Sequence, residues 1–344
     1  MKVLMIGPAR SVNGGISAVV NNYYKAGLDK KVQLQYIGTM EDGSKWHKLK
    51  VAIQALMQFI FMVYKFDLVH INMASDVSLY RKIPFIYLTK AFGKKLVIHQ
   101  HGGNIKQFYY SECSTKRRQF IQKILRKADA FIVVAPYLKD IFKNIVEEEK
   151  IVVLPNAIEI PGNISKKYEE QNLLFLGRLC KEKGIFELLE AVKELKKEFP
   201  NLHLYLGGVW VEEELERKAR QCEGYVHYLG WIDAEQKDKY LKNCNIFVLP
   251  TYFEGLPMSL LEGMAYGCAC VASEVGGIPQ VMTSGKDGIL VPAKEIKDLR
   301  DALKKLLERP LLQRELGRNA RKTVEEGYDI HKSIQKLLQI YQSV

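Results

Sequence analysis

Short apolar runs alternate with stretches of helical periodicity along the whole chain. The clearest helix is predicted at residues 185–199, where apolar positions recur at the three/four spacing of one helix face. The runs that predict strands lie at 2–7, 32–37, 67–72, 96–99, 130–134, 151–154, 173–177, 203–207, 226–229, 246–249, 269–272 and 289–291. Apolar strands separated by amphipathic helices are typical of parallel sheets covered on both faces. The pattern therefore predicts an α/β fold.

A break near residues 155–171 divides this pattern into two sets of elements. Pro155, Pro161 and Gly162 interrupt it, and a polar run follows at 165–171. Each set is about the size of one doubly wound domain. We therefore expect two facing Rossmann-like domains, residues 1–162 and residues 163–326, followed by a terminal amphipathic helix at 327–344. Since ligands bind beyond the carboxyl ends of the strands in such sheets, the active site is expected in a deep cleft between the domains.

Composition is that of a folded globular protein, but the charge is unevenly distributed. The 344 residues are 47% hydrophobic and 26% charged, and the net charge is +12. Residues 1–165 hold 24 Lys and Arg against 12 Asp and Glu, whereas residues 166–344 hold 27 of each. An anionic partner is therefore expected to meet the first half of the chain.

No segment predicts export or a membrane span. The apolar run at 2–7 is too short for a signal peptide, and the run at 51–64 is too short to cross a bilayer and contains Gln54 and Gln58. The six cysteines form no C-x-x-C pair, which favours buried reduced thiols in a cytosolic protein over disulfides or zinc. We expect a soluble protein, and surface association stays open.

The first half of the chain contains only weak sequence motifs for a chemical function. Gly14-Gly15 precedes a helical stretch, and neither a dinucleotide fingerprint nor a P-loop is present. A glycine pair at a helix start lets backbone N–H groups approach an anion, although a simple turn has the same pattern. His99 and His101 lie two apart at a strand end, and we expect their side chains to point to opposite sides. No Cys or acidic partner is nearby, which also argues against a metal site. His101, beside Gly102, is the better site candidate.

A basic loop in the second half has a clearer meaning. Arg178 and Lys183 follow the strand at 173–177 and precede the helix at 185–199. Cations at the carboxyl end of a strand and the amino end of a helix favour a phosphate. A solvated basic loop is the alternative if the loop stands alone.

Two carboxylates follow the strand at 246–250. Pro257 is suited to the first turn of a helix, which puts Glu254 just outside that helix and Glu262 inside it. Carboxylates accept hydrogen bonds from vicinal hydroxyls, and the N–H groups of residues 256–259 between them can take phosphate oxygens. This arrangement suits a sugar joined to a diphosphate. A second glycine pair, Gly276-Gly277, follows the strand at 269–272.

The order of these motifs resembles glycosyltransferase family 4. The likeness covers almost the whole chain and is most specific in the second half, from Gly177-Arg178 through Glu254-x7-Glu262 to the segment 285–291. These are retaining enzymes of the GT-B fold that use nucleotide sugars, many of them in bacterial cell-surface polysaccharide synthesis. The resemblance implies that the terminal helix crosses back to the first domain.

The resemblance also implies roles for single residues. Arg178 and Lys183 would hold the diphosphate, Glu254 the transferred sugar, and His101 would sit near the reacting sugar, so these four are the implied catalytic residues. The implied donor-binding residues are Gly14, Gly15, Arg178, Lys183, Gly208, Trp231, Ile232, Glu254, Gly255, Leu256, Pro257, Met258 and Glu262. Because these cations and helix N-termini meet the electrostatic demand, no metal or other cofactor is expected.

Most of the excess charge lies in residues 81–127, which hold 12 Lys and Arg and a single acid, Glu112. Basic helices edged with aromatic residues are expected at an anionic membrane surface, although a solvated helix face has the same composition. The predicted acceptor and membrane surface comprises Lys45, Trp46, Lys48, Lys50, Arg81, Lys82, Lys90, Lys94, Lys95, Arg117 and Arg118. Nucleic acid is disfavoured because no RNP, KH or zinc-finger pattern appears.

The function expected from these observations is that of a retaining, metal-independent glycosyltransferase. It would move a sugar from a UDP- or GDP-sugar to a lipid-linked or polysaccharide acceptor, in capsule, exopolysaccharide or lipopolysaccharide synthesis. Its expected place is the cytoplasm, peripheral on the inner face of the plasma membrane. The alternative is a catalytically silent GT-B protein that acts as a membrane-docking or assembly partner. The intact Arg178/Lys183 and Glu254/Glu262 sets favour the enzyme.

Overall fold

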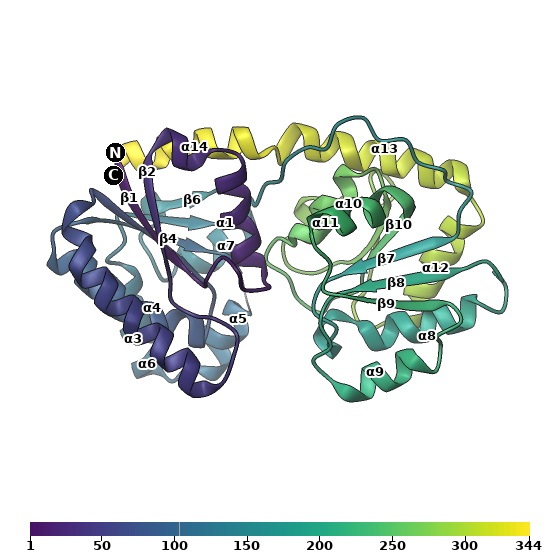
Figure 1. The fold of residues 1–344 in the computed structure, drawn as a ribbon, viewed down its shortest axis with the longest axis horizontal. Coiled ribbons are helices and arrows are strands. Elements are labelled where there is room, and N and C mark those ends of the chain that lie inside the picture. The colour runs from purple at the N-terminus through teal and green to yellow at the C-terminus, as the bar shows by residue number, and fades with distance from the viewer. Residues whose placement is uncertain (103) are drawn as a thin grey trace. The chain divides into compact units, whose positions relative to one another are not determined.

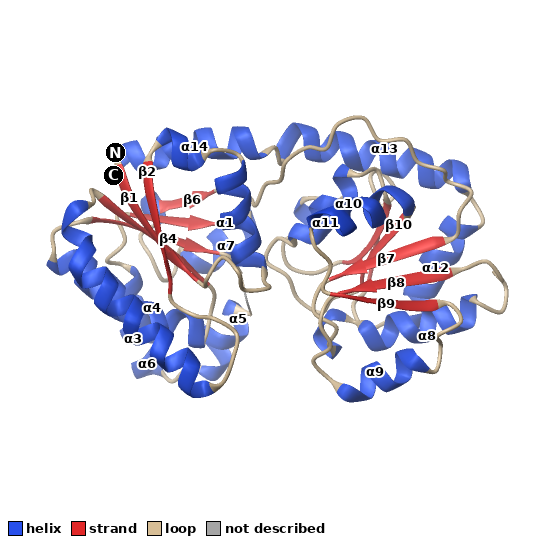
Figure 2. Ribbon diagram, viewed as in Figure 1, coloured by secondary structure: helices blue, strands red, loops and turns tan. Residues whose placement is uncertain are grey.

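The computed structural model describes residues 1–102 and 104–344 and consists of two compact units. The first unit contains Met1–Glu159 together with Ile330–Val344, and the second contains Ile160–Asp329. Each unit is a six-stranded parallel sheet with helices, as Figures 1 and 2 show. The predicted α/β class with two Rossmann-like domains is confirmed, and every predicted apolar run forms a strand.

The sheet of the first unit has the order β2-β1-β3-β4-β5-β6. Its strands are β1 (Lys2–Gly7), β2 (Gln33–Gly38), β3 (Leu68–Met73), β4 (Lys95–Gln100), β5 (Ala130–Val133) and β6 (Ile151–Val153). All six residues of β3 are buried, as expected for a strand covered on both faces. β2 is an edge strand, and its first four residues alternate between exposed and half-buried.

Helices cover both faces of this sheet. They are α1 (Gly15–Lys25), α2 (Leu28–Lys31), α3 (Lys45–Met62), α4 (Val77–Ala91), α5 (Ile105–Gln107), α6 (Thr115–Leu125), α7 (Pro136–Phe142) and α14 (Ile330–Ser343), with short 3-10 or π turns at 63–65, 108–112 and 148–150. α3, α4 and α6 pack side by side on one face, and α14 lies against α1 on the other (Figure 1). Ser44 begins α3 by accepting a hydrogen bond from the backbone N–H of His47.

The sheet of the second unit has the order β12-β11-β10-β7-β8-β9. Its strands are β7 (Asn172–Leu176), β8 (His203–Gly207), β9 (Val226–Gly230), β10 (Ile246–Leu249), β11 (Ala269–Ser273) and β12 (Ile289–Val291). Its helices are α8 (Ile185–Leu195), α9 (Glu213–Arg220), α10 (Ala234–Asn243), α11 (Met258–Ala265), α12 (Ile296–Leu307) and α13 (Pro310–Gly327), with 3-10 turns at 181–183 and 278–280. α8 packs against α12, and α11 against α13.

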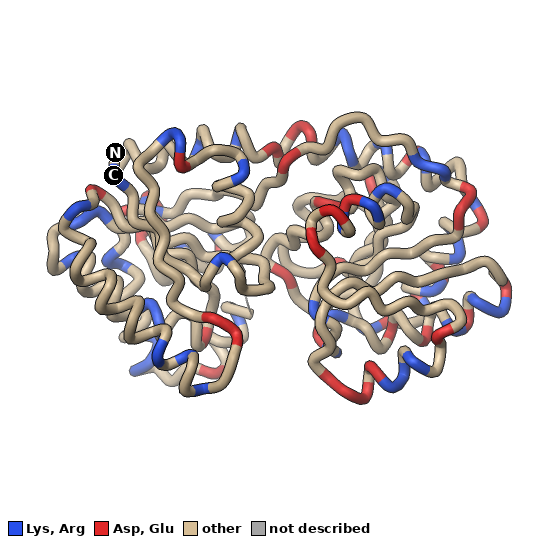
Figure 3. Tube along the Cα trace, viewed as in Figure 1, with Lys and Arg blue, Asp and Glu red and all other residues tan. Residues whose placement is uncertain are grey.

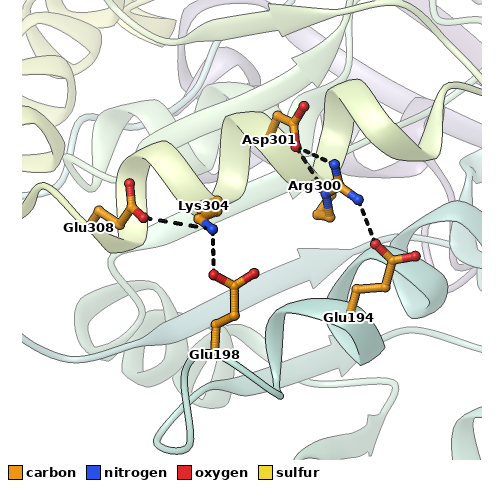
Figure 4. A network of polar contacts seen from close by, with 6 residues as sticks. All are labelled: Glu194, Glu198, Arg300, Asp301, Lys304 and Glu308. Atoms are coloured by element: carbon orange, nitrogen blue, oxygen red, sulfur yellow. Dashed lines mark hydrogen bonds and ion pairs between the residues drawn. The ribbon is translucent and has the colours of Figure 1, made fainter.

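An ion-pair network joins α8 and α12 at the surface of the second unit (Figure 4). Arg300 on α12 reaches Glu194 at 2.8 Å and Asp301 at 2.7 Å, and Lys304 contacts both Glu198 and Glu308. Exposed pairs of this kind contribute little to stability, so the apolar faces beneath them hold the two helices together. None of the six residues of this network is a predicted donor residue, so Arg300 and Lys304 can serve as control positions.

No helix in the described part of the chain is both long and apolar enough to cross a membrane.

Candidate functional site

The loops that follow the strands of the second unit gather at the carboxyl edge of its sheet. The loop after β7 is tied to the loop after β8 by a hydrogen bond from the Leu179 N–H to the Val209 carbonyl, at 2.9 Å. It is tied to the loop after β10 by a hydrogen bond from the Tyr252 N–H to the Glu182 carbonyl, at 2.8 Å. These backbone bonds fix the loops against one another before any ligand arrives.

Two glycines are required for this close loop packing. Gly184 has φ +70°, and a Cβ there would lie 1.9 Å from the Pro250 carbonyl oxygen. Gly276 has φ +56°, and its Cβ would lie 1.8 Å from the Glu254 carbonyl oxygen. Both the left-handed conformation and the lack of space therefore demand glycine. The loop that carries Glu254 is thus held on both sides by glycine backbone.

Lys183 and Glu254 form an ion pair at the centre of these loops. Lys183 ends the 3-10 turn at 181–183, and Glu254 lies in the loop between β10 and α11. Their side chains are only 21% and 14% exposed. The sequence predicted both residues in the site, and the structure adds that they are in direct contact. Arg178 lies exposed in the loop after β7.

The second carboxylate of the motif has a partner that sequence reasoning missed. Glu262 on α11 lies 2.5 Å from the Nζ of Lys237 on α10, and the Glu262 side chain is 17% exposed. A capping box between Asp233 and Gln236 begins α10 and so places Lys237 in its first turns. That capping pattern is readable in the sequence, but the contact between α10 and α11 is not.

The amino end of α11 supplies backbone donors beside Glu254. α11 begins at Met258, with Pro257 as the preceding extended residue rather than part of the first turn as predicted, because its ψ is 122°. The first N–H groups of a helix have no intrahelical acceptor and carry the positive end of the helix dipole. Gly255, Leu256, Pro257 and Met258 are buried around this end. An anionic group that reaches it would find both donors and favourable charge.

The predicted base-contact residues lie at the neighbouring strand ends. The Gly208 N–H donates to the Gly230 carbonyl at 2.8 Å, which ties the loops after β8 and β9 together. Trp231 follows β9 and is 50% exposed, while Ile232 is half-buried. These residues therefore share the loop edge with Arg178 and Lys183.

In the first unit, Gly14 and Gly15 begin α1 and are exposed. A Cβ at either position would meet no atom of the protein within 4 Å. Packing within the unit therefore does not require glycine at either position.

His101 follows β4 and is half-buried, and it extends a row of imidazoles formed by the buried His70 on β3 and His99 on β4. The His101 ring stacks on that of His99 with 3.9 Å between centroids, so the prediction that the two side chains point to opposite sides is wrong, because residues two apart share one face of a strand. The His101 Nε2 lies 2.8 Å from the Asn72 Oδ1, and the side chain also hydrogen-bonds Asn156. Since the Asn72 amide nitrogen donates to the Ile6 carbonyl, His101 donates from Nε2. Burial lowers the pKa of His101 to about 3, so the ring is neutral near pH 7. Among the described residues, no group of three or more His, Cys, Asp or Glu is arranged to hold a metal ion.

A cavity of about 680 Å³ in the first unit was not predicted from the sequence. It lies between the edge strand β2 and α3, next to the carboxyl end of β1. Its lining is largely polar and includes the cations Arg10 and Lys50, the ion pair of Glu41 with His47, and the amides Gln35, Gln54 and Gln58. Such a cavity can receive a hydroxyl-rich or anionic group.

The predicted basic surface needs one correction. Lys82 is 2% exposed and hydrogen-bonds Thr39, so the prediction that it lies at the surface is wrong. Burial, with Arg81 nearby, lowers its pKa to about 7. Lys90 forms an ion pair with Asp129 at 2.9 Å, so its positive charge is compensated within the unit.

The remaining predicted cations divide between exposed and half-buried positions. Lys94 and Arg118 donate to the carbonyls of Tyr64 and Cys113, and Arg81 is half-buried. The exposed residues of the predicted surface are Lys45, Trp46, Lys48, Lys50, Lys95 and Arg117.

Sequence comparison decides the family to which this chain belongs. Residues 35–160 match the profile described as Glycosyltransferase Family 4, and residues 157–323 match that of the glycosyl transferases group 1. The chain belongs to the family 4 glycosyltransferases. The profile of the group 1 transferases covers all the donor loops described above.

Two sequence relatives and one solved structure illustrate what this glycosyltransferase is similar to. It is 27% identical to an uncharacterized glycosyltransferase of Methanocaldococcus jannaschii over 83% of this chain and 78% of that protein. It is 34% identical to the N,N'-diacetylbacillosaminyl-diphospho-undecaprenol alpha-1,3-N-acetylgalactosaminyltransferase of Campylobacter jejuni, over 60% of this chain and 52% of the relative. The structure of Anabaena HepE in complex with UDP-glucose aligns over 100% of both chains, with a TM-score of 0.81 and 16% identity. This likeness shows the GT-B fold.

Proposed function

We propose that the protein is a retaining glycosyltransferase that moves a sugar from a UDP- or GDP-sugar to a lipid-linked or polysaccharide acceptor, at the inner face of the plasma membrane. The pathway would be synthesis of a bacterial capsule, exopolysaccharide or lipopolysaccharide. The Lys183–Glu254 pair among the donor loops of a GT-B fold carries this proposal. The HepE complex with UDP-glucose and the diphospho-undecaprenol named for the Campylobacter relative support the donor and acceptor classes.

The charges around the donor loops fit a sugar joined to a diphosphate. Lys183 is oriented by Glu254, and Arg178 lies exposed in the same loop. The amino end of α11 adds backbone donors. In the proposed complex, these groups hold the diphosphate, so that Lys183 exchanges part of its contact with Glu254 for phosphate oxygens. Glu254 is then available to the sugar hydroxyls.

In the proposed reaction, the bond between the anomeric carbon and the diphosphate oxygen breaks. A bond from the acceptor hydroxyl oxygen forms on the same face of the sugar, and the leaving phosphate oxygen takes the acceptor proton. The products are a nucleoside diphosphate and a glycoside of retained configuration. Arg178, Lys183 and the α11 amino end stabilise the negative charge that develops on the diphosphate, which is why we propose that no metal is needed.

Glu254 is not a nucleophile in this scheme. Its carboxylate is held by Lys183, and the family resemblance assigns it hydroxyl contacts. His101 also has no role as a base in this scheme, because its Nε2 donates to Asn72 and its pKa is lowered to about 3. Trapping a covalent glycosyl adduct on Glu254 would contradict the scheme.

The first unit is proposed to receive the acceptor. The polar cavity between β2 and α3, with Arg10 and Lys50 in its lining, suits the sugar-phosphate part of a lipid-linked acceptor. The open space beside Gly14 and Gly15 lets a ligand approach the amino end of α1.

A thermal-shift panel of nucleoside diphosphates and nucleotide sugars tests the donor class. We expect UDP or GDP, and one of the corresponding sugars, to raise the melting temperature in the presence of EDTA. Product formation with that sugar would then distinguish an enzyme from a catalytically silent docking protein. No shift with any nucleotide would contradict the proposal.

A further inference from the structure

The outer face of α3 carries a continuous row of large exposed apolar side chains. Trp46 is 81% exposed and Phe61 66% exposed, which is unusual for side chains of this size. The row comprises Trp46, Leu49, Ile53, Met57, Phe61 and Tyr64, and is called the α3 stripe below.

The spacing of the α3 stripe puts it on one side of the helix, because its members recur every three or four residues. The opposite side, with Val51, Ala55 and Phe59, is buried in the unit. A third side, with Lys50, Gln54 and Gln58, faces the cavity beside β2. The helix therefore lies flat on its unit, with the α3 stripe facing outward along its length.

Cations frame the α3 stripe, and acids are missing from it. Residues 43–66 contain Lys45, Lys48, Lys50 and Lys65 but no Asp or Glu. Figure 3 shows the basic positions towards the beginning of the helix, with an uncharged stretch following. At its other end, Lys94 donates to the Tyr64 carbonyl at 3.0 Å.

We propose that the α3 stripe lies in the surface of an anionic phospholipid bilayer. The apolar side chains would enter the boundary between headgroups and acyl chains, and the lysines at both ends would meet the anionic headgroups. The sequence alone placed most of the membrane contact at residues 81–127. The structure favours α3 instead, because Lys82 is buried and Lys90 is paired with Asp129.

Charge complementarity selects lipid over a second copy of the chain. A symmetric dimer through the α3 stripe would bring together two helices that each carry Lys45, Lys48 and Lys50 and no Asp or Glu in residues 43–66. The nearest preceding acids are Asp42 and Glu41, and Glu41 already pairs with His47 of the same chain. Anionic headgroups remove that repulsion. The inference deepens the proposed function, since it gives the surface from which a lipid-linked acceptor would enter the neighbouring cavity.

Flotation with liposomes tests the proposal without turnover. The wild-type protein should float with vesicles of phosphatidylcholine and phosphatidylglycerol in equal amounts, and much less with phosphatidylcholine alone. The double substitution Trp46→Ser/Phe61→Ser should lower the partition coefficient by about tenfold or more, because two large apolar side chains no longer insert. Lys45→Glu/Lys48→Glu should lower it on the anionic vesicles. Leu311→Ser, which removes an 81% exposed side chain from the second unit, is the matched control and should float like the wild type.

Two results would overturn the proposal. One is undiminished flotation of Trp46→Ser/Phe61→Ser. The other is a wild-type dimer, seen by light scattering, that becomes monomeric in this variant, since the α3 stripe would then bind a second copy. Unchanged melting curves verify that the variants are folded. A wild-type protein that floats but binds no nucleotide would contradict the proposed function and leave this inference standing.

Discussion

Lys183 and Glu254 are the residues on which the proposed donor site depends. Each is a charged side chain with most of its surface covered, and each satisfies the other. Removing one partner of such a pair leaves the other charge poorly compensated, so the two positions are coupled. The pair keeps a cation at the place where the leaving phosphate is proposed to develop charge.

Arg178→Gln and Lys183→Gln should each lower kcat by about a hundredfold or more, because each removes a cation from the developing charge on the diphosphate. Steady-state kinetics with the donor identified by thermal shift would measure this. Arg300→Gln and Lys304→Gln, in the network of Figure 4, are the matched controls and should keep wild-type rates. Equal losses in the controls, or near-normal rates in the site variants, would remove the assigned roles.

The sequence could name candidate residues for the proposed donor site but not their contacts. Arg178, Lys183, Glu254 and Glu262 follow from strand ends and motif spacing. Their partners do not, because Lys237 reaches Glu262 from a helix distant in sequence. Lys82 was misplaced although a signal existed: it shares a three/four spacing with Leu79 and Ile86, which are both buried on the inner face of α4.

At the scale of elements, tight loops rather than helices set the geometry of the donor site. Gly184 and Gly276 both adopt positive φ values and both touch the backbone of the loop after β10. The sequence indicated the pair Gly276-Gly277 as a second glycine pair after a strand but gave no special role to Gly184. The partner of each glycine depends on the strand order β11-β10-β7, which propensity does not specify.

Gly276→Ala should destabilise the protein by about 1 kcal/mol or more, since a Cβ disfavours the left-handed backbone. It should also weaken donor binding, because the displaced Glu254 carbonyl moves the site loop. Urea unfolding and nucleotide titration would measure the two effects. Gly224→Ala adds a Cβ that meets no atom within 4 Å and serves as the control. Wild-type stability and affinity for Gly276→Ala would contradict this view of the loop.

The histidines of β3 and β4 make the stability of the first unit depend on pH. Burial lowers the pKa of both His70 and His101 from 6.5 to about 3, and that of His99 well below 6.5. Between about pH 6.5 and pH 3 the unfolded chain therefore binds more protons than the folded one, so stability falls as pH falls.

Each of these histidines should lower the free energy of unfolding by about 1 kcal/mol between pH 7.5 and pH 5.5. Urea unfolding at the two pH values would measure the change. His99→Gln should remove the part of this pH dependence that comes from His99, because that side chain then takes up no proton on unfolding. Identical stability of the wild type at both pH values would show that the imidazoles are protonated in the folded protein.

At the scale of the whole molecule, the two units divide the proposed work. Residues 166–344, which include the whole second unit from β7 onward, hold 27 Lys and Arg against 27 Asp and Glu, whereas residues 1–165 carry the whole excess of positive charge. In the first unit, α3 has one side in the core, one beside the polar cavity and one exposed and apolar. The sequence predicted a basic acceptor domain. Only the packing of α3 in the structure shows which side of this helix is buried, which side lines the cavity and which side is exposed.

The central claim is that these units together transfer a sugar from a nucleotide donor with retention. The most direct measurement is the anomeric configuration of the product, read by proton NMR from a reaction with the identified nucleotide sugar in the presence of EDTA. We predict a product with the same anomeric configuration as the donor sugar. A product of inverted configuration, or no transfer from any nucleotide sugar, would contradict the account.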